Sequence, residues 1–394
     1  MMIRAVLGNP NHPEYGVATI PFPIPRDQYA HCVELLEALE IGDAVKADCK
    51  VERIDSFYTV LKRTEMLTVN VEELNYLAKR LDSFDTGEAA QFQAMAHKLE
   101  LFELKDLINL TFCCQQATVI TDFSDLAAIG RNHYMNLHGG SASVDELNAL
   151  DGKGTARQLI ESGSGTITPY GVVYDNGMRL EQIYDGRFFP CYYYEPNAIT
   201  VAVTSKAEPE DTEHITWLFL PMVQEEIDRA LLCGGITDPS EIRLSLEDSW
   251  LPHEVFDLLD MDHVDISELN ALVQALDEFS DMSIRKYAAA AVMARPHTTE
   301  QAKHLAENLD LFDFAPSAST PEEYGKYMIQ QSGRFEYDEN LDAFYDYEKY
   351  GTERMNEEDG MFTDRGYIAY KGYISMEEVM SGSQSSHMEM GGMM

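Results

Sequence analysis

Several clusters of histidine and carboxylate side chains have the residue types that metal chemistry requires. His253 and Glu254 begin like the H-E-x-x-H helix of zinc hydrolases, but position 257 is aspartate where that motif places its second histidine. The acidic loops at 257–268 and 356–360 offer the oxygen ligands that Ca²⁺ prefers. Neither loop combines ligands at positions 1, 3 and 5 with glycine at 6 and glutamate at 12. A helix cap or a solvated loop is the simpler interpretation, and a metal-dependent hydrolase or calcium-binding protein that uses these loops is the alternative.

The remaining reactive residue types form no recognisable catalytic pattern. The glycine pairs at 152–154 and 163–165 lack the third glycine and the strand-to-helix context of a phosphate-binding loop. No serine or cysteine lies in a nucleophile elbow or a protease signature. The six cysteines have irregular spacings without a C-x-x-C pair, which indicates reduced thiols rather than disulfides or a zinc site. We therefore expect a protein that is not an enzyme and has no catalytic residue, no cofactor and no metal.

The charge of the chain excludes several classes of partner. The 394 residues include 68 acidic and 29 basic side chains, which give a formal net charge of -39. Hydrophobic residues make up 45% of the chain, enough to form packed cores. Such a charge repels DNA, RNA and anionic lipid, so basic protein partners are favoured and direct nucleic-acid binding is not expected. No apolar run of 18 residues is present, and the opening residues do not form a secretory signal. These features predict a cytoplasmic protein without membrane contact.

Two groups of carboxylates are spaced so that they can imitate a track of phosphates. Glu34, Glu37 and Glu40 follow one another at intervals of three residues, as a row on one face of a helix expected over 27–39. The densest acidic stretch spans 335–360, where tyrosine and phenylalanine residues between the acids indicate an ordered surface. The predicted partner-binding acids of this stretch are Glu336, Asp338, Glu339, Asp342, Asp346, Glu348, Glu353, Glu357, Glu358 and Asp359.

The spacing of these carboxylates suits a protein that normally binds DNA. Neighbouring carboxylates on a helix face stand about 5–6 Å apart, and duplex DNA carries one charge per ~1.7 Å of its axis. A DNA-binding protein would meet such a surface with the lysines and arginines that it uses on DNA. Solubility or salt tolerance is the alternative reason for the charge.

An internal repeat organises the elements that must position these residues. Residues 73–84 recur at 268–279 with the shared pattern E-L-N-x-L followed by L-D-x-F, an offset of 195 residues. The same offset relates Gly130 to Gly325, and further matches follow in order along the chain. We interpret the chain as a tandem duplication.

Each copy is expected to have a helical middle between small mixed segments, an α+β fold. The apolar residues of 74–81 recur at i, i+3, i+4 and i+7, which predicts a helix with one buried face. Asp265 and Ser267 are candidate N-caps of the equivalent helix in the second copy. A strand-turn-strand pattern closes the copies at 166–174 and 362–370.

The expected divisions follow from this pattern. Copy one spans 1–195, with mixed α/β segments at 1–70 and 136–195 around helices at 71–135. Copy two spans 196–376, with mixed segments at 196–264 and 331–376 around helices at 265–330, and a disordered tail follows at 377–394.

The second copy resembles the ArdA family of antirestriction proteins over about residues 265–370. The shared motifs are E-L-N at 268–270, Y-G-x-Y-M-I at 324–329, F-Y-D-Y-E-x-Y-G at 344–351 and F-T-x-x-G-Y-I at 362–368. Copy one keeps the central motif, but its C-terminal block is degenerate, because Lys153-Gly154 stands at the position that corresponds to Tyr350-Gly351.

This resemblance implies a non-enzymatic DNA mimic that mobile genetic elements carry to protect incoming DNA. Members of the family are elongated, three-domain, usually dimeric proteins that occupy the DNA-binding channel of type I restriction-modification enzymes. They are about half the length of this chain. We therefore expect the tandem chain to reproduce in one polypeptide some of what dimerisation does elsewhere, with a homodimer left open. Inhibition of another defence nuclease is the alternative target.

Overall fold

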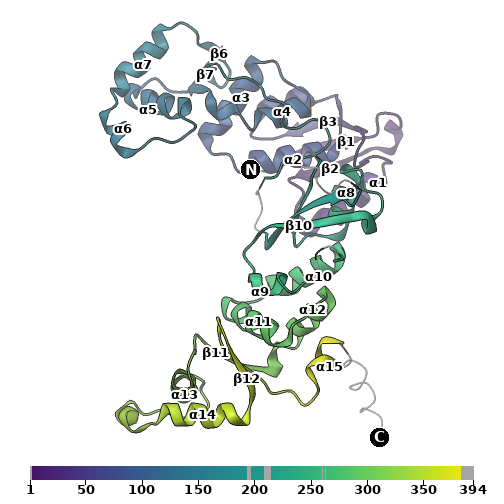
Figure 1. Ribbon diagram of the computed structural model, residues 1–394. Helices are drawn as coiled ribbons and strands as arrows, with labels where there is room; N and C mark the ends of the chain where they lie inside the picture. Colours follow the sequence, from purple (N-terminus) through teal and green to yellow (C-terminus); the bar gives the residue numbers. More distant parts are fainter. Residues whose placement is uncertain (1, 193–196, 208–213, 260, 262, 383–394) are drawn as a thin grey trace. The chain divides into compact units, whose positions relative to one another are not determined.

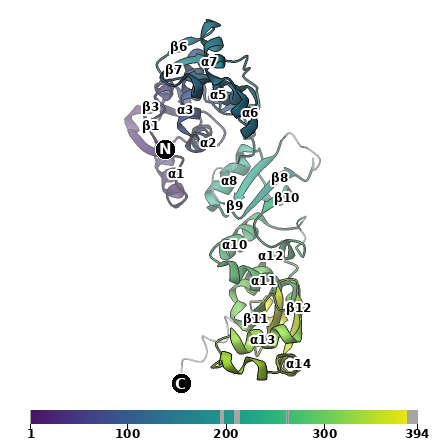
Figure 2. The same ribbon diagram turned by 90° about the vertical axis from the view of Figure 1, so that its left-hand side faces the viewer.

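The computed structural model describes residues 2–192, 197–207, 214–259, 261 and 263–382. The chain divides into two compact units (Figures 1 and 2). Unit 1 comprises Met1–Pro196, Glu213–Trp217 and Val223–Thr237, and unit 2 comprises Asn197–Thr212, Leu218–Met222 and Asp238–Met394. Both units contain small sheets and short helices, so the predicted α+β class is confirmed.

Unit 1 opens with a small antiparallel sheet. Its elements are β1 (Ile3–Gly8), η1 (Pro13–Tyr15), β2 (Val17–Phe22), η2 (Arg26–Gln28), α1 (Tyr29–Glu37), β3 (Cys49–Asp55), η3 (Thr59–Thr64) and β4 (Thr68–Val69). The strands lie in the order β2-β1-β3-β4, and every neighbouring pair is antiparallel. Ile3, Ala5 and Leu7 are fully buried at alternate positions of β1, as expected for a strand with one face on the core.

The middle of unit 1 is helical. It contains α2 (Val71–Asp82), α3 (Thr86–Lys98) and α4 (Leu104–Leu110). The helix predicted from the apolar stripe is α2, and Leu74, Leu77 and Leu81 are at most 1% exposed. Asn70 caps α2 by accepting hydrogen bonds from the backbone N–H groups of Glu72 and Glu73.

A second sheet closes unit 1. The elements are η4 (Cys114–Gln116), β5 (Thr118–Ile120), α5 (Leu126–Leu137), α6 (Val144–Ala149), α7 (Gly152–Glu161), β6 (Thr166–Thr168) and β7 (Gly171–Tyr174), and the strand order is β5-β7-β6. Helices α5 and α7 touch at their backbones, since a Cβ on Gly130 would lie 1.8 Å from the carbonyl oxygen of Gly152. The hairpin predicted over 166–174 is confirmed as β6 and β7.

Helix α8 (Gln224–Cys233) belongs to unit 1 although it follows strands of unit 2 in the sequence. Two ion pairs with little solvent exposure hold it on α2. Lys79 Nζ lies 3.0 Å from Glu226 Oε1, and Arg229 Nε lies 2.6 Å from Glu72 Oε1. The division predicted at 195/196 therefore misses this packing, because it depends on contacts between residues about 150 positions apart.

Unit 2 has a similar sequence of elements, without a counterpart of β4 and without α8, which belongs to unit 1. It contains β8 (Ile199–Ser205), β9 (Thr216–Leu220), η5 (Pro239–Glu241), β10 (Ile242–Ser249), α9 (His253–Phe256), α10 (Ile266–Asp277), α11 (Asp281–Ala294), α12 (Thr299–Glu307), η6 (Leu309–Leu311) and β11 (Phe312–Pro316). It ends with α13 (Pro321–Gln330), η7 (Glu339–Phe344), α14 (Tyr347–Glu357), β12 (Asp359–Thr363), β13 (Gly366–Tyr370) and α15 (Met376–Met380). The sheets have the orders β10-β8-β9 and β11-β13-β12.

The matching topology supports the duplication hypothesis. Each unit has a first sheet, of four strands in unit 1 and three in unit 2, in which the first strand lies between the next two in sequence. Three helices of the middle follow, and then a three-stranded sheet in which the last strand is central. The repeated asparagines have the same role: Asn75 Oδ1 accepts from the backbone N–H of Ile24 at 2.8 Å, and Asn270 Oδ1 accepts from that of Met222 at 2.9 Å. Both side chains thus join the first helix of the middle to the preceding sheet segment.

Four details differ from the sequence-based expectations. Helices α5 and α13 pack on α7 and α14, so they group with the closing segments rather than with the helical middles. Asp265, and not Ser267, is the N-cap of α10, with its carboxylate accepting from the N–H groups of Ser267 and Glu268. The predicted tail begins with helix α15, and its remainder, 383–394, lies outside the described residues. Finally, α1 ends at Glu37, earlier than predicted.

Candidate partner-binding surface

The acidic stretch predicted at 335–360 forms one end of unit 2. It includes η7, α14 and the start of β12, and it packs on α13 (Figure 1). Two glycines allow α14 to contact α13 at the backbone: a Cβ on Gly351 would lie 1.8 Å from the Pro321 carbonyl oxygen, and one on Gly325 would lie 2.1 Å from that of Tyr347. This backbone contact fixes α14, and with it the acids that α14 carries, against α13.

Asp342 is the centre of a hydrogen-bond cluster that orders the turn before α14. Its Oδ1 accepts from the hydroxyls of Tyr337 and Tyr347, both at 2.6 Å, and from Gln330 Nε2 at 2.8 Å. These bonds stabilise the ionised form, so they lower the pKa of Asp342, with the bond from Tyr337 the largest cause. The same bond raises the pKa of Tyr337 above its ordinary value. Asp342 is therefore ionised at neutral pH, and its hydrogen bonds also order the chain around it.

Two other predicted acids cap elements of this surface. The carboxylate of Asp338 accepts from the Asn340 N–H at the start of η7, and that of Asp346 accepts from the Lys349 N–H at the start of α14. A carboxylate at a helix N-terminus stabilises the helix by satisfying a free N–H group and by its charge. Both side chains remain exposed, so they contribute charge to the surface as well.

Glu358 points inward, in contrast to the other acids predicted here. Its carboxylate accepts from the hydroxyl of Tyr324 at 2.6 Å and pairs with the Arg354 guanidinium, and its side chain is 14% exposed. Burial and the Glu358 carboxylate raise the pKa of Tyr324, which keeps this hydroxyl a donor. Glu358 thus ties α13 to the end of α14 and is a poor candidate for direct contact with a partner.

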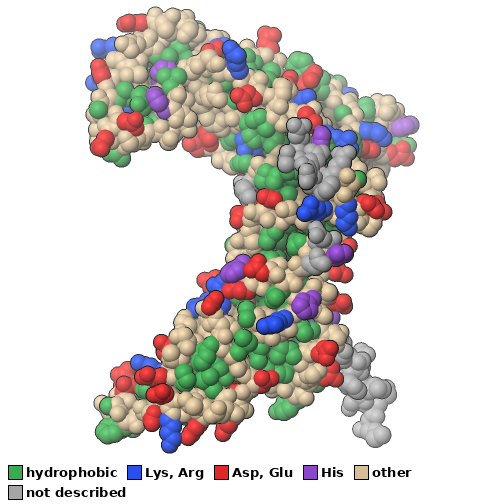
Figure 3. Space-filling view, viewed as in Figure 1, with side chains coloured by type: hydrophobic (Ala, Val, Ile, Leu, Met, Phe, Trp, Pro, Cys, Tyr) green, Lys and Arg blue, Asp and Glu red, His purple; other side chains and the backbone are tan. Residues whose placement is uncertain are grey.

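The other predicted acids of the stretch are exposed together. Figure 3 shows carboxylate side chains beside hydrophobic ones over the end of unit 2 that carries α13 and α14. The exposed acids are Glu336, Asp338, Glu339, Asp342, Asp346, Glu348, Glu353, Glu357 and Asp359, which we call the acidic tip. Lys349 and Arg354 are the basic residues of 335–360, so the tip has a strongly negative balance.

The predicted carboxylate row in unit 1 is shorter than expected. Glu34 and Glu37 lie exposed on α1, but Glu40 follows the end of the helix with a φ of 55°. The row of three on one helix face is therefore wrong, because α1 ends at Glu37 and Glu40 lies in the turn that follows. Two carboxylates remain on the helix, and Glu34 Oε2 lies 3.8 Å from His31 Nδ1.

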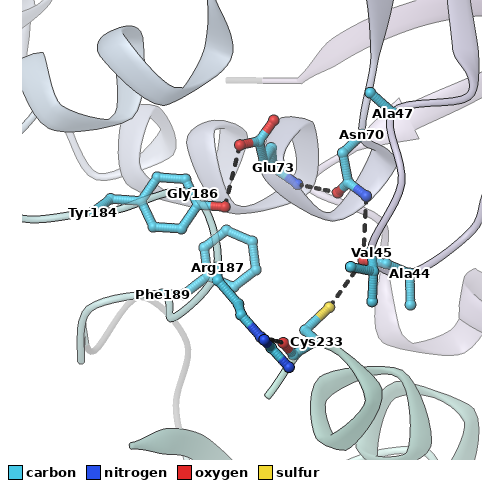
Figure 4. A pocket seen from close by; sticks show the side chains of 10 residues that line it. All are labelled: Ala44, Val45, Ala47, Asn70, Glu73, Tyr184, Gly186, Arg187, Phe189 and Cys233. Carbon is cyan, nitrogen blue, oxygen red and sulfur yellow. Dashed lines mark hydrogen bonds between the residues drawn. The ribbon is translucent and has the colours of Figure 1, made fainter. Parts of the chain in front are cut away.

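Unit 1 contains a small cavity whose polar groups bond to one another (Figure 4). The Glu73 carboxylate accepts from the Tyr184 hydroxyl at 3.1 Å, and burial raises its pKa. Cys233 Sγ donates to the Ala44 carbonyl at 3.0 Å, and burial raises the pKa of this thiol to about 12. Arg187 Nε donates to the carbonyl of Cys233 at 3.2 Å. The thiol is therefore protonated at neutral pH and unsuited to act as a nucleophile.

The structure assigns other roles to the described residues of the metal motifs. Glu254, from the zinc-like pair, accepts two hydrogen bonds from Arg365, at 2.7 Å from Nε and 3.1 Å from Nη2. Asp260 and Asp262 lie outside the described residues, whereas Asp265 is the cap of α10. Within the described part of the chain, no group of three or more His, Cys, Asp or Glu side chains is arranged to hold a metal ion.

The tip also contains residues that sequence reasoning did not select as partner contacts. Phe335, Leu341 and Phe344 are 49%, 47% and 84% exposed beside the acids. The aromatic residues were expected only to order the surface, which Tyr337 and Tyr347 do. The sequence signal for this apolar pair is the three-residue spacing of Leu341 and Phe344, which places the two side chains on one face only if the segment forms a 3-10 helix.

Comparison with known proteins gave one family match. Residues 213–369 match the family model described as antirestriction protein (ArdA). This segment includes helices α10 to α14 and the whole acidic tip. The comparison with curated proteins gave no match. Among the described residues, no helix is long and apolar enough to cross a membrane.

Proposed function

We propose that the chain, whose residues 213–369 match the antirestriction protein (ArdA) family model, blocks restriction by occupying the DNA-binding groove of a type I restriction-modification enzyme. The carboxylates of the inhibitor occupy the positions at which the groove binds DNA phosphates. No bond is made or broken, and inhibition is competition with DNA for one site. The basic groove, and not DNA, is the partner of this chain.

The acidic tip is the observation that supports this proposal. Nine exposed carboxylates lie on a segment of 24 residues, 336–359, which Gly351 and the Asp342 cluster hold in a defined shape. A disordered acidic chain would lose conformational freedom on binding, whereas a folded surface has already lost it. The tip can therefore present closely spaced charges to a groove at a small entropic cost. The exposed Glu34 and Glu37 of α1 form a separate, smaller acidic group on unit 1.

The proposal is tested by competition. A purified type I restriction-modification enzyme is mixed with labelled target DNA and increasing amounts of the chain, at about 50 and 200 mM salt. We expect displacement of DNA at near-stoichiometric protein, weaker at the higher salt because counterion effects reduce each charge contact. Unchanged DNA binding with folded protein present would contradict the type I target.

A charge-reversal variant then locates the contact. Five acids that are not buried and do not cap an element are changed together: Glu336→Lys, Glu339→Lys, Glu348→Lys, Glu353→Lys and Glu357→Lys. We expect inhibition to weaken by at least about tenfold, because attraction at each position becomes repulsion.

A matched control separates local contact from net charge. It reverses five exposed acids of unit 1, namely Asp27, Glu100, Asp145, Glu161 and Glu181. Both variants change the net charge by the same amount. Equal loss in the two variants would show that long-range charge, and not the acidic tip, determines inhibition.

A further inference from the structure

The acidic tip presents an apolar pair on one side of a short turn. Leu341 and Phe344 lie in η7 and are 47% and 84% exposed. A 3-10 helix has three residues per turn, so residues at i and i+3 lie directly above one another. The two side chains therefore form one exposed patch.

The turn that carries this pair is held from both ends. Asp338 caps η7 through the Asn340 N–H at 2.9 Å. Asp342, between Leu341 and Phe344, is bonded to Tyr337 before the turn, to Tyr347 after it and to Gln330 on α13. A large apolar side chain on a preorganised turn is typical of an interface anchor, because little freedom is lost when it is buried.

The charges around the pair indicate what covers it. Ten acidic and two basic residues lie within 335–360. A second copy of the same tip would bring like charges together, and nucleic acid or an anionic membrane would be repelled in the same way. A basic protein surface with an apolar depression is the complementary partner.

DNA, like the acidic tip, combines negative charges with apolar groups. Beside its phosphates it presents apolar features, such as the thymine methyl group and the faces of its bases, and proteins place apolar and aromatic side chains against them. A groove built for DNA therefore has apolar sites between its basic side chains.

We propose that Phe344, supported by Leu341, is an apolar anchor that enters a base- or sugar-binding site in the groove of the target enzyme. This inference rests on the proposed function and extends it: the tip imitates an apolar part of DNA as well as its charge. Affinity then has one component that depends on salt, from the carboxylates, and one that does not, from the anchor.

The two units differ in this feature. The equivalent segment of unit 1 contains α6, where Val144 is 73% exposed, but no aromatic residue occurs from 139 to 165. The anchor therefore belongs to unit 2, and Val144 supplies an internal control.

The test measures the Kd between the whole chain and a type I enzyme at several salt concentrations. We expect Phe344→Ser to raise Kd by about tenfold or more at every salt concentration, as for an interface hot spot. The slope of log Kd against log salt should stay unchanged, whereas the charge-reversal variant should alter that slope. Phe344→Trp should retain most of the affinity, and Val144→Ser should have no effect. Because Phe344 is exposed, its replacement should leave the melting temperature unchanged, and circular dichroism checks this.

Three results would overturn the anchor. A Kd of Phe344→Ser within about twofold of the unmodified chain would show that the ring makes no important contact. Dissociation of a dimer by Phe344→Ser in light scattering would show that a second copy covers the ring. Failure of the unmodified chain to bind the enzyme would reject the proposed function itself, and the anchor with it. Normal binding that survives Phe344→Ser rejects only the anchor.

Discussion

The acidic side chains of 335–360 divide into those that order this segment and those that remain exposed for contact with a partner. Glu358 accepts from Tyr324 and pairs with Arg354, so its charge is largely used within unit 2. One carboxylate oxygen of Asp342 accepts hydrogen bonds from the Tyr337 and Tyr347 hydroxyls. Glu336 and Glu348 are exposed and do not cap an element. The count of acids in the sequence therefore overstates the number that a partner can contact.

The hydrogen bonds to Asp342 lead to a prediction on its ionisation. Because they lower its folded-state pKa, they contribute stability above the pKa of the unfolded aspartate, about 3.9. That contribution is lost as the pH falls through the lower folded-state value. Tyr337→Phe removes the largest cause, so we expect the pKa of Asp342 to rise toward its ordinary value, measured by NMR titration of the side-chain carboxyls.

Tyr345→Phe is the control for this measurement. The Tyr345 ring lies 5.8 Å from that of Tyr347 and 5.9 Å from that of Tyr337, and it shares their surroundings. Its hydroxyl is not among the donors to Asp342. An equal change of the Asp342 pKa in both variants would contradict the assigned role of the Tyr337 bond.

At the scale of elements, paired glycines determine how the helices of each closing segment cross. Gly351 and Gly325 bring α14 and α13 together in unit 2, and Gly130 and Gly152 do the same for α5 and α7 in unit 1. Glycine within a helix ordinarily costs about 0.5–1 kcal/mol relative to alanine. Its presence at these crossings is explained by the close approach of the backbones.

Gly351→Ala should therefore destabilise unit 2, although alanine has a higher helix propensity than glycine. The added methyl group would meet the Pro321 carbonyl oxygen at 1.8 Å, and overpacking of this kind costs about 1–3 kcal/mol. The expected result is a lower melting temperature and weaker inhibition, because the acids of α14 would move. Gly87→Ala in α3 is the control: its nearest neighbour is a side-chain oxygen of Asp85 at 3.1 Å rather than a backbone atom at 1.8 Å, so any loss of stability should be much smaller. A Gly351→Ala variant as stable as the unmodified chain would refute the close crossing.

At the scale of the whole molecule, two units of like topology lie in one chain. The duplication hypothesis proposes that the second unit supplies what a second subunit supplies in shorter family members. The repeated Asn75 and Asn270 contacts support a common origin of the units. Their surfaces are not equivalent, because the acidic and aromatic tip belongs to unit 2 and has no aromatic counterpart at 139–165 in unit 1.

This proposal predicts the mass in solution. Light scattering should give a monomer of about 44.5 kDa at micromolar concentration, since the net charge of -39 opposes self-association. Raising the salt concentration to about 0.5 M screens that repulsion and should still leave a monomer. A stable dimer under both conditions would contradict the idea that duplication replaces dimerisation.

The sequence by itself determined the features that depend on local pattern and composition. The acidic balance, the helix at 71–82 and the closing hairpins follow from residue type and spacing, which act between near neighbours. The motifs of 268–368 also indicated the family whose model matches residues 213–369.

Only the tertiary structure decided which side chains of the candidate surface are free. Glu358 is turned inward by Tyr324, which lies 34 residues away, and Glu40 lies outside its predicted row because α1 ends at Glu37. Helix α8 is drawn to unit 1 by Glu72 and Lys79, far from it in sequence. The turn that carries Phe344 is bonded through Asp342 to three side chains from other parts of the chain. Such contacts join residues through space, so no periodicity along the chain can reveal them.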